Sequence, residues 1–277
     1  MPATVGAAIH RIANEKLGGA ERAATGIRIG VFTTSAYIPF MCGRFTYRLT
    51  WPELVRLYRL TLDAPARNIQ PRYNICPTTD IDAVIEREGK RGLLPMRWGL
   101  VPSWWPRPLK DMRIATFNAR AEAVARKPTL RDAFKRTRCL IPASGYYEWQ
   151  DTADGKQPYY FTRRDGQPIT FAGLWDTWWN KQAGEAINSC AMVITGANEF
   201  VAEIHDRMPI ILEADQFEPW LTGRAGLEVL KFAAKDVLQC WPVSKRVNSS
   251  RASDDDASLI EQISPPEKPS DAMPVML

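Results

Sequence analysis

Histidine and cysteine are scarce in this chain, with two histidines and five cysteines among 277 residues. The cysteines are widely spaced, odd in number and form no C-x-x-C pair, so neither a disulfide framework nor a zinc site is indicated. We therefore expect no metal and no other cofactor. The cysteines are Cys42, Cys76, Cys139, Cys190 and Cys240.

Long hydrophobic runs are also missing. No segment approaches the roughly 18 apolar residues of a membrane-spanning helix, so association with a membrane is not expected. The mildly apolar stretch 29–40 is interrupted by Thr33, Thr34 and Ser35, and no small-residue cleavage site follows it. The sequence predicts a protein of the reducing cytoplasm.

Positive charge is concentrated in one stretch. The net charge is +5, and residues 110–138 hold nine basic side chains against three acidic ones. Such a stretch is expected of a surface that meets phosphates. A solvated helix face explains the same charge at least as well.

Composition divides the chain into three regions. Residues 1–40 are rich in Ala and Gly and carry no chemical motif, so we expect an extension that is absent from the mature protein. Residues 41–245 form the body, and a chain of 277 residues that is 45% hydrophobic can bury a sizeable core. Residues 246–277 are polar and proline-rich, and are predicted to be a disordered tail.

The body contains more strand patterns than helix patterns. Thr50 to Glu53 form a capping box that opens a helix running to about Arg59, and further helices are predicted at 119–126 and after Thr129. Without a regular strand–helix alternation, an α+β fold around a partly closed sheet is favoured. The predicted strands are 81–86, 94–98, 139–141, 145–149, 159–162, 169–174, 189–195 and 239–243.

Met41 is followed directly by Cys42. If translation starts at Met41, an aminopeptidase can remove it, because the next side chain is small, and Cys42 becomes the first residue. A free amino-terminal cysteine is a 1,2-aminothiol, which traps an aldehyde as a thiazolidine ring. The alternative is an ordinary buried thiol after an incidental methionine.

Two short motifs pair a polar residue with an arginine. Asn118 falls at a possible helix N-cap with Arg120 in the first turn, so capping is the default role, and orienting a nucleophile while the guanidinium binds phosphate is the alternative. His205, the single histidine of the body, is followed by Arg207. A lone histidine is more often structural than catalytic.

Glu148 lies in the aromatic sequence Ser144-Gly145-Tyr146-Tyr147-Glu148-Trp149. In a strand, alternation places Tyr146 and Glu148 on one face and Tyr147 and Trp149 on the other. A carboxyl group among aromatic rings is partly desolvated, which raises its pKa and suits it to proton transfer. An exposed glutamate on an edge strand is the equally weighted alternative.

Tryptophan is abundant, with ten in the chain. Trp104 and Trp105 stand together just before the basic stretch, and adjacent aromatic side chains in a loop can stack on unpaired bases. Core packing is the competing explanation. We assign the other body tryptophans, Trp175, Trp178, Trp179, Trp220 and Trp241, to the core.

Taken together, the motifs resemble the SOS response-associated peptidase family, the abasic-site processing proteins, from about Met41 to Ser244. The motifs that carry the resemblance are Met-Cys-Gly-Arg-Phe at 41–45, Tyr-Asn-Ile-Cys-Pro-Thr at 73–78, Trp-Gly-Leu-Val-Pro-Ser-Trp at 98–104, Phe-Asn-Ala-Arg-Ala-Glu at 117–122, Cys-Leu-Ile-Pro-Ala-Ser-Gly-Tyr-Tyr-Glu-Trp at 139–149, Phe-Ala-Gly-Leu-Trp at 171–175 and His-Asp-Arg-Met-Pro at 205–209.

The resemblance implies a single, mostly antiparallel, barrel-like domain, acting as a monomer on single-stranded DNA that contains abasic sites. In that family the amino-terminal cysteine forms a covalent thiazolidine with the ring-opened sugar, in response to DNA damage. Cys42 maps onto that cysteine, Asn118 onto the asparagine that positions it, Glu148 onto the proton-transfer carboxylate and His205 onto the histidine that assists sugar opening. The residues expected to contact DNA are Arg44, Trp104, Trp105, Arg120, Trp149 and Arg207.

One feature departs from the family pattern, because forty residues precede Cys42 and would acylate its nitrogen. Either translation begins at Met41, which we favour, or the segment is cut away by a self-processing peptidase activity of Cys42, Glu148 and His205. Two other functions stay open. They are a thiol peptidase of the SOS response and a noncovalent single-strand binder.

Overall fold

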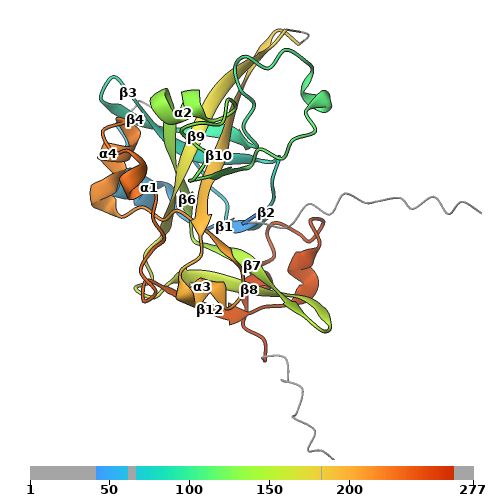
Figure 1. The fold of residues 1–277 in the computed structure, drawn as a ribbon. Coiled ribbons are helices and arrows are strands. Elements are labelled where there is room, and N and C mark those ends of the chain that lie inside the picture. Colours follow the sequence, from blue (N-terminus) through green and yellow to red (C-terminus); the bar gives the residue numbers. More distant parts are fainter. Residues whose placement is uncertain (1–41, 62–66, 182, 265–277) are drawn as a thin grey trace, which may run out of the picture. The chain divides into compact units, whose positions relative to one another are not determined.

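Two β-sheets organise the protein in the computed structural model, which describes residues 42–61, 67–181 and 183–264 (Figure 1). The predicted extension 1–40 lies outside the described residues. Within the described ranges, no helix has the length and apolar character needed to cross a membrane.

The larger sheet closes into a five-stranded barrel. Strands β9 and β10 form a long hairpin, and β10 also runs parallel to β4, with Cys190 beside Trp98, which completes the ring. The other neighbouring strands of the ring are antiparallel. The five strands are β3 (Asp80–Arg87), β4 (Lys90–Trp98), β6 (Arg138–Ala143), β9 (Ile169–Asn180) and β10 (Glu185–Gly196).

Two short strands extend the barrel along the last residues of β10. Strand β5 (Asn118–Arg120) runs parallel to β10 and pairs with it just beyond the residues of β10 that pair with β4. Strand β11 (Arg207–Pro209) pairs antiparallel with β10. Both carry candidate site residues. The end of β10 therefore positions much of the site.

The second sheet is antiparallel throughout, in the order β12-β8-β7-β1-β2. Its alternation confirms the prediction for residues 145–149: Tyr146 packs in the barrel core, whereas Tyr147 and Trp149 belong to a second, smaller cluster. The strands are β1 (Phe45–Tyr47), β2 (Arg72–Ile75), β7 (Gly145–Thr152), β8 (Gly155–Arg163) and β12 (Leu238–Pro242).

Helices are few and short. The predicted capping box of Thr50 and Glu53 opens α1 (Trp51–Tyr58), which buries Leu54 and Tyr58 and ends at Arg59 in the left-handed region. The other α-helices are α2 (Arg131–Arg136), α3 (Glu199–Ala202) and α4 (Phe217–Leu221). Single 3-10 turns span Leu109–Asp111, Ala214–Gln216, Leu227–Val229, Lys245–Asn248 and Ala257–Ile260. The predicted α+β class, with a mostly antiparallel, barrel-like sheet, is confirmed.

The helix predicted at 119–126 is wrong. Asn118 begins strand β5, where it lies opposite Met192, and residues 121–126 form turns. Asn118 is therefore not a helix N-cap. Pairing with the barrel strand β10 overrides the local preference of this segment, as tertiary contacts commonly do.

The disorder predicted from residue 246 onwards is wrong for residues 246–264. This segment packs on the outer face of the second sheet, where Val247 and Leu259 are buried with Trp149. Arg72 forms an ion pair with Asp254, with nitrogen and oxygen 2.5 Å apart. A few apolar side chains therefore hold this polar segment on the second sheet. Residues 265–277 lie outside the described part of the chain.

The exposure of two side chains contradicts two further expectations. Trp179, assigned to the core, is 56% exposed near the end of the β9–β10 hairpin. The basic stretch 110–138 does not form one surface, because Arg138 is buried and stacks on Phe134 and Trp220. Charge density along a sequence does not by itself place side chains on one face.

Candidate functional site

Strand register brings Cys42 to Glu148. On the neighbouring strands β1 and β7, Phe45 lies opposite Tyr146, and the Tyr147 amide donates to the carbonyl of Arg44. Because the strands are antiparallel, the residues just before β1 approach Glu148. Cys42 is only 2% exposed, and its φ of 36° lies in the left-handed region that residues other than glycine seldom adopt.

Glu148 is completely buried, and neither carboxylate oxygen has a hydrogen bond of good geometry with a described residue. Desolvation raises its pKa to about 8, and the negative charge of Asp206 acts in the same direction. The thiol and backbone nitrogen of Cys42 lie close enough to favour the charged form and partly oppose the shift. The carboxyl group can therefore give or take a proton near neutral pH.

The Cys42 thiol is held in its neutral form. Burial raises its pKa well above the usual value, and the neighbouring Glu148 raises it further, whereas Arg207 opposes the shift. A thiolate nucleophile normally needs the opposite, a lowered pKa beside a cation. Cys42 therefore depends on a base to ionise it.

His205 lies in the turn between α3 and β11, with Nδ1 3.8 Å from Oε2 of Glu148. The backbone amide of Arg207 donates to this Nδ1 at 3.1 Å, and Nδ1 is also 3.2 Å from the Arg207 carbonyl. Oδ1 of the exposed Asp206 lies 3.5 Å from the same nitrogen. These contacts fix the ring beside the carboxyl group.

Asn118 reaches Cys42 from the barrel. Its Nδ2 donates to the Cys42 carbonyl oxygen at 3.4 Å. Arg120 lies opposite Ile194 on one side of β10, and Arg207 lies opposite Gly196 on the other side. The positive charge of Arg207 acts on the Cys42 thiol, and Arg120 lies two residues after Asn118 on β5.

Two residues of the site were not recognised in the sequence. The hydroxyl of Tyr146 is buried without a hydrogen-bond partner among the described residues, and its pKa is raised by burial and by Glu148 and Cys42. Glu122 accepts from Nη1 of Arg207 at 2.7 Å. Strand alternation had already placed Tyr146 on the face of Glu148, whereas no sequence pattern pairs Glu122 with Arg207.

Two residues expected at the DNA surface are buried instead. Arg44 is 3% exposed and donates to Asn74 and to the carbonyl of Val247, at 2.5 and 2.6 Å. Trp149 is 3% exposed, and its indole donates to Asn248 at 2.7 Å. Both side chains hold the segment after residue 245 on the second sheet.

Trp104 and Trp105 do not join the cluster around Cys42. They lie in the loop between β4 and β5, and Trp104 is 51% exposed. The amide of Ser103 donates to Asp176 at 2.7 Å, which ties this loop to β9. The pair therefore belongs to a separate surface.

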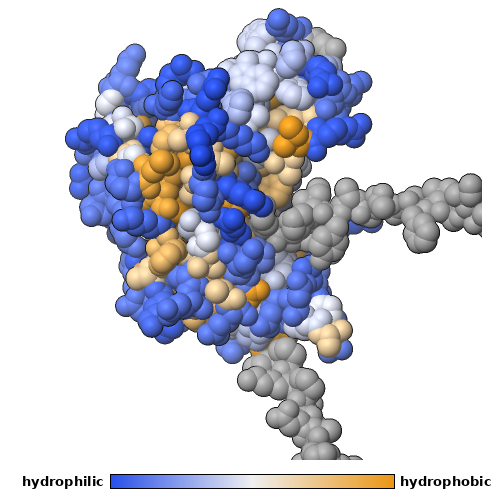
Figure 2. All heavy atoms as spheres, viewed as in Figure 1, coloured by the Kyte–Doolittle hydropathy of each residue, from blue (hydrophilic) through white to orange (hydrophobic). Residues whose placement is uncertain are grey.

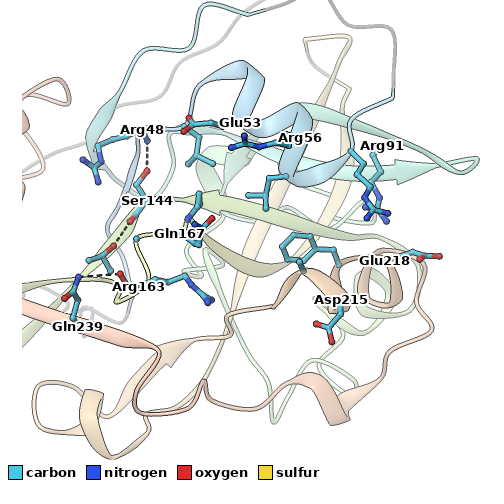
Figure 3. A pocket seen from close by; sticks show the side chains of 18 residues that line it. Arg48, Glu53, Arg56, Arg91, Ser144, Arg163, Gln167, Asp215, Glu218 and Gln239 are labelled. Atoms are coloured by element: carbon cyan, nitrogen blue, oxygen red, sulfur yellow. Dashed lines mark hydrogen bonds between the residues drawn. The ribbon is translucent and has the colours of Figure 1, made fainter.

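A cleft of about 950 Å³ lies beside α1, and none of Cys42, Asn118, Glu148 and His205 lines it (Figure 3). Basic and acidic side chains face one another across it, with Arg56 on one wall and Asp215 on the other. Glu53 caps α1, and Arg163 pairs with Asp165 and Glu213. These contacts support local structure.

Among the described residues, no group of three or more His, Cys, Asp or Glu side chains could hold a metal ion. Beside the Cys42 thiol, the Glu148 oxygens and the Tyr146 hydroxyl are buried and make no hydrogen bond of good geometry with a described residue. Buried polar groups are nearly always hydrogen-bonded, so such a gathering beside a thiol is typical of a site for a polar ligand.

Comparison with known proteins places the chain in a family. Residues 41–250 match SOS response associated peptidase (SRAP), and the chain belongs to this family. The abasic site processing protein YoaM of Bacillus subtilis is 34% identical over 220 residues, which cover 76% of this chain and 94% of the relative. YedK of Escherichia coli, also named an abasic site processing protein, is 30% identical over 233 residues, covering 80% and 100% of the two chains.

Similarity extends to animals and to solved structures. The abasic site processing protein HMCES of Gallus gallus is 32% identical over 217 residues, covering 66% of this chain and 64% of the relative. A crystal structure of a protein from Bacteroides thetaiotaomicron superposes with a TM-score of 0.72 at 22% identity, covering 80% of this chain and all of that one. At 22% identity, the similarity to this crystal structure shows a shared fold.

Proposed function

We propose that this protein processes abasic sites in single-stranded DNA by forming a covalent thiazolidine through Cys42, as a monomer on damaged DNA of the nucleoid. The names of the relatives support the target. The observation that carries the chemistry is the contact of Cys42 with a buried, proton-exchanging Glu148, joined by His205.

The reaction needs no cofactor. The α-amine of Cys42 adds to the aldehyde carbon C1′ of the opened sugar, and loss of water gives an iminium ion. The thiol then adds to that carbon and its proton moves to Glu148, so that one aldehyde and one aminothiol yield a thiazolidine and a water molecule. Since amine and thiol belong to one residue, the second addition is intramolecular and strongly favoured.

Each neighbouring side chain has a role that matches its position. Glu148, with a pKa of about 8, carries protons between the amine, the departing oxygen and the thiol. His205 assists opening of the sugar, and Asn118 holds the Cys42 backbone. Arg120 and Arg207 bind phosphates beside the lesion. Arg207 gives up its ion pair with Glu122 when it binds the phosphate.

A thiol peptidase is a weaker candidate, although the family carries that name. Burial and Glu148 raise the pKa of the Cys42 thiol, whereas thiol peptidases act through a readily formed thiolate. The aminothiol route needs the thiol only after the imine has formed. The electrostatics therefore favour reaction with an aldehyde.

The decisive experiment incubates protein that begins at Cys42 with a single-stranded oligonucleotide containing one abasic site. We expect a protein–DNA adduct that survives a denaturing gel. Cys42→Ala should abolish it. So should one extra residue before Cys42, which acylates the amine but leaves the thiol.

The outcomes separate the three functions. An adduct with the extended protein would contradict the aminothiol mechanism. Cleavage of a supplied peptide without DNA would support the peptidase. Salt-sensitive DNA binding with no adduct, unchanged in Cys42→Ala, would identify a noncovalent binder.

The phosphate contacts have their own test. We expect Arg120→Ala to weaken binding to single-stranded DNA and to lower the salt slope by about one, because one phosphate contact is lost. Arg56→Ala is the matched control, since Arg56 is an exposed arginine beside the cleft in Figure 3. Equal losses in the two variants, measured by fluorescence anisotropy from 50 to 200 mM salt, would refute the assignment.

A further inference from the structure

A second groove, of about 490 Å³, lies between the loop at 103–108 and the end of the β9–β10 hairpin. Figure 1 shows this hairpin rising at the top of the molecule beside that loop. The side chains that define the groove are Trp104, Trp105, Trp178, Trp179, Arg107 and Lys181.

Two of these tryptophans are exposed and yet held on a fixed framework. Trp104 is 51% and Trp179 56% exposed. Beneath them Trp178 is buried, and its indole donates to the carbonyl of Trp105 at 2.8 Å. Large apolar side chains gathered in one exposed groove mark an interaction surface.

The charges of the groove indicate its partner. The guanidinium of Arg107 lies 5.2 Å from the centre of the Trp105 ring, and Lys181 adds a second cation. None of the lining residues is acidic. Aromatic faces interleaved with cations suit single-stranded nucleic acid, whose bases stack while its phosphates meet the positive charges.

Strand register fixes how far this groove lies from Cys42. Asn118, which contacts Cys42, pairs with Met192, and Met192 pairs with Gly173. Trp179 lies six residues further along β9. At about 3.3 Å per residue the separation along the strand direction is about 20 Å, roughly the length of six stacked nucleotides.

We infer that this groove binds the bases of the DNA strand on one side of the abasic site. Trp104 and Trp179 are the stacking surfaces, and Arg107 and Lys181 bind the phosphates. In Figure 2 the top of the molecule carries pale side chains surrounded by hydrophilic blue ones. The inference rests on the proposed function, and it adds Trp179, Arg107, Lys181 and the reach along the strand.

The test measures noncovalent binding by fluorescence anisotropy in a Cys42→Ala background, which forms no adduct. One probe has an abasic site with ten-nucleotide arms, and two others have one arm cut to two nucleotides, on the 5′ or the 3′ side. We expect Trp179→Ala to weaken binding of the long probe about tenfold, a typical effect of removing one stacking surface. Trp179→Phe should retain most of the affinity.

Truncation identifies the side of the lesion. One of the two shortened probes should bind wild-type and Trp179→Ala protein equally, because it no longer reaches the groove. Leu227→Ala, which removes another exposed apolar side chain, should leave all affinities unchanged. Unchanged binding of the long probe by Trp179→Ala would overturn the inference, as would an equal loss for all three probes.

An undamaged single strand of the same length separates this inference from the proposed function. Stacking in the groove does not require a lesion, so Trp179→Ala should weaken this probe as well. If wild-type protein formed no adduct but Trp179→Ala still weakened binding of the undamaged probe, the crosslinking function would be refuted and the groove would be supported as a binding site. If an adduct formed and Trp179→Ala weakened binding of no probe, the crosslinking function would be supported and the groove would be refuted as a binding site.

Discussion

Glu148 combines two properties that a protein seldom allows together, full burial and lack of a well-formed hydrogen bond within the described residues. Its pKa of about 8 means that the folded protein binds a proton there at neutral pH, whereas an unfolded chain releases it near 4.5. A protonated acid therefore lies next to the Cys42 thiol. The free energy of unfolding should therefore depend on pH.

Glu148→Gln is expected to stabilise the protein more at pH 8 than at pH 5. The raised pKa of Glu148 contributes stability that is fully present below about 4.5 and is lost as pH rises toward about 8. Glutamine does not titrate, so the variant does not lose this contribution as pH rises. The difference in unfolding free energy between Glu148→Gln and wild-type protein should therefore grow by about a few kcal/mol, in favour of the variant, from pH 5 to pH 8. Urea unfolding at several pH values measures it, and parallel curves would contradict the assignment.

At the scale of elements, the segment after residue 245 does more than end the chain. It covers the outer face of the second sheet and receives the Arg44 guanidinium two residues from Cys42. The backbone of Tyr73 also donates to Asp254. The segment therefore contacts both the residue before β1, through Arg44, and strand β2, through Tyr73.

Leu259→Ala should destabilise the protein by about 2–4 kcal/mol, since Leu259 is fully buried against Trp149 and Val243. Ile263→Ala is the control, because Ile263 is 36% exposed, and its effect should stay below about 1 kcal/mol. Denaturant unfolding compares the two. Equal, negligible effects would show that this segment is not part of the folded unit.

At the scale of the whole molecule, the site forms where the two sheets meet. Cys42 and Glu148 come from the second sheet, whereas Asn118, Arg120 and Arg207 come from strands beside β10 of the larger sheet. The proposed reaction also needs a free nitrogen on Cys42. A left-handed φ costs of order 1–3 kcal/mol when a peptide precedes the residue, and an amino-terminal cysteine has no such torsion.

We therefore predict that translation starts at Met41 and that the mature chain begins at Cys42. Intact-mass measurement of protein expressed from its native gene should give a chain that begins at Cys42. A stable product that retains residues 1–40 and still crosslinks DNA would refute it.

Much of the fold could be predicted from local patterns. All eight predicted strand runs occur, and the capping box placed α1 correctly, because alternation and capping act between residues close in sequence. The helix at 119–126 was mispredicted because β5 exists only through its pairing with β10. Trp179 and Arg138 were misassigned because composition does not reveal which side chains a barrel encloses.

By itself, the sequence determined which residue types are available, namely one candidate aminothiol, one histidine in the body and a carboxyl group on the same strand face as Tyr146. Tertiary structure alone decided that they meet, since Cys42 and Glu148 are more than a hundred residues apart and become neighbours through the β1–β7 register. It also decided the pKa of Glu148, because desolvation depends on what surrounds a group in space. Local chemistry follows from the chain, whereas proximity and burial follow only from the packed fold.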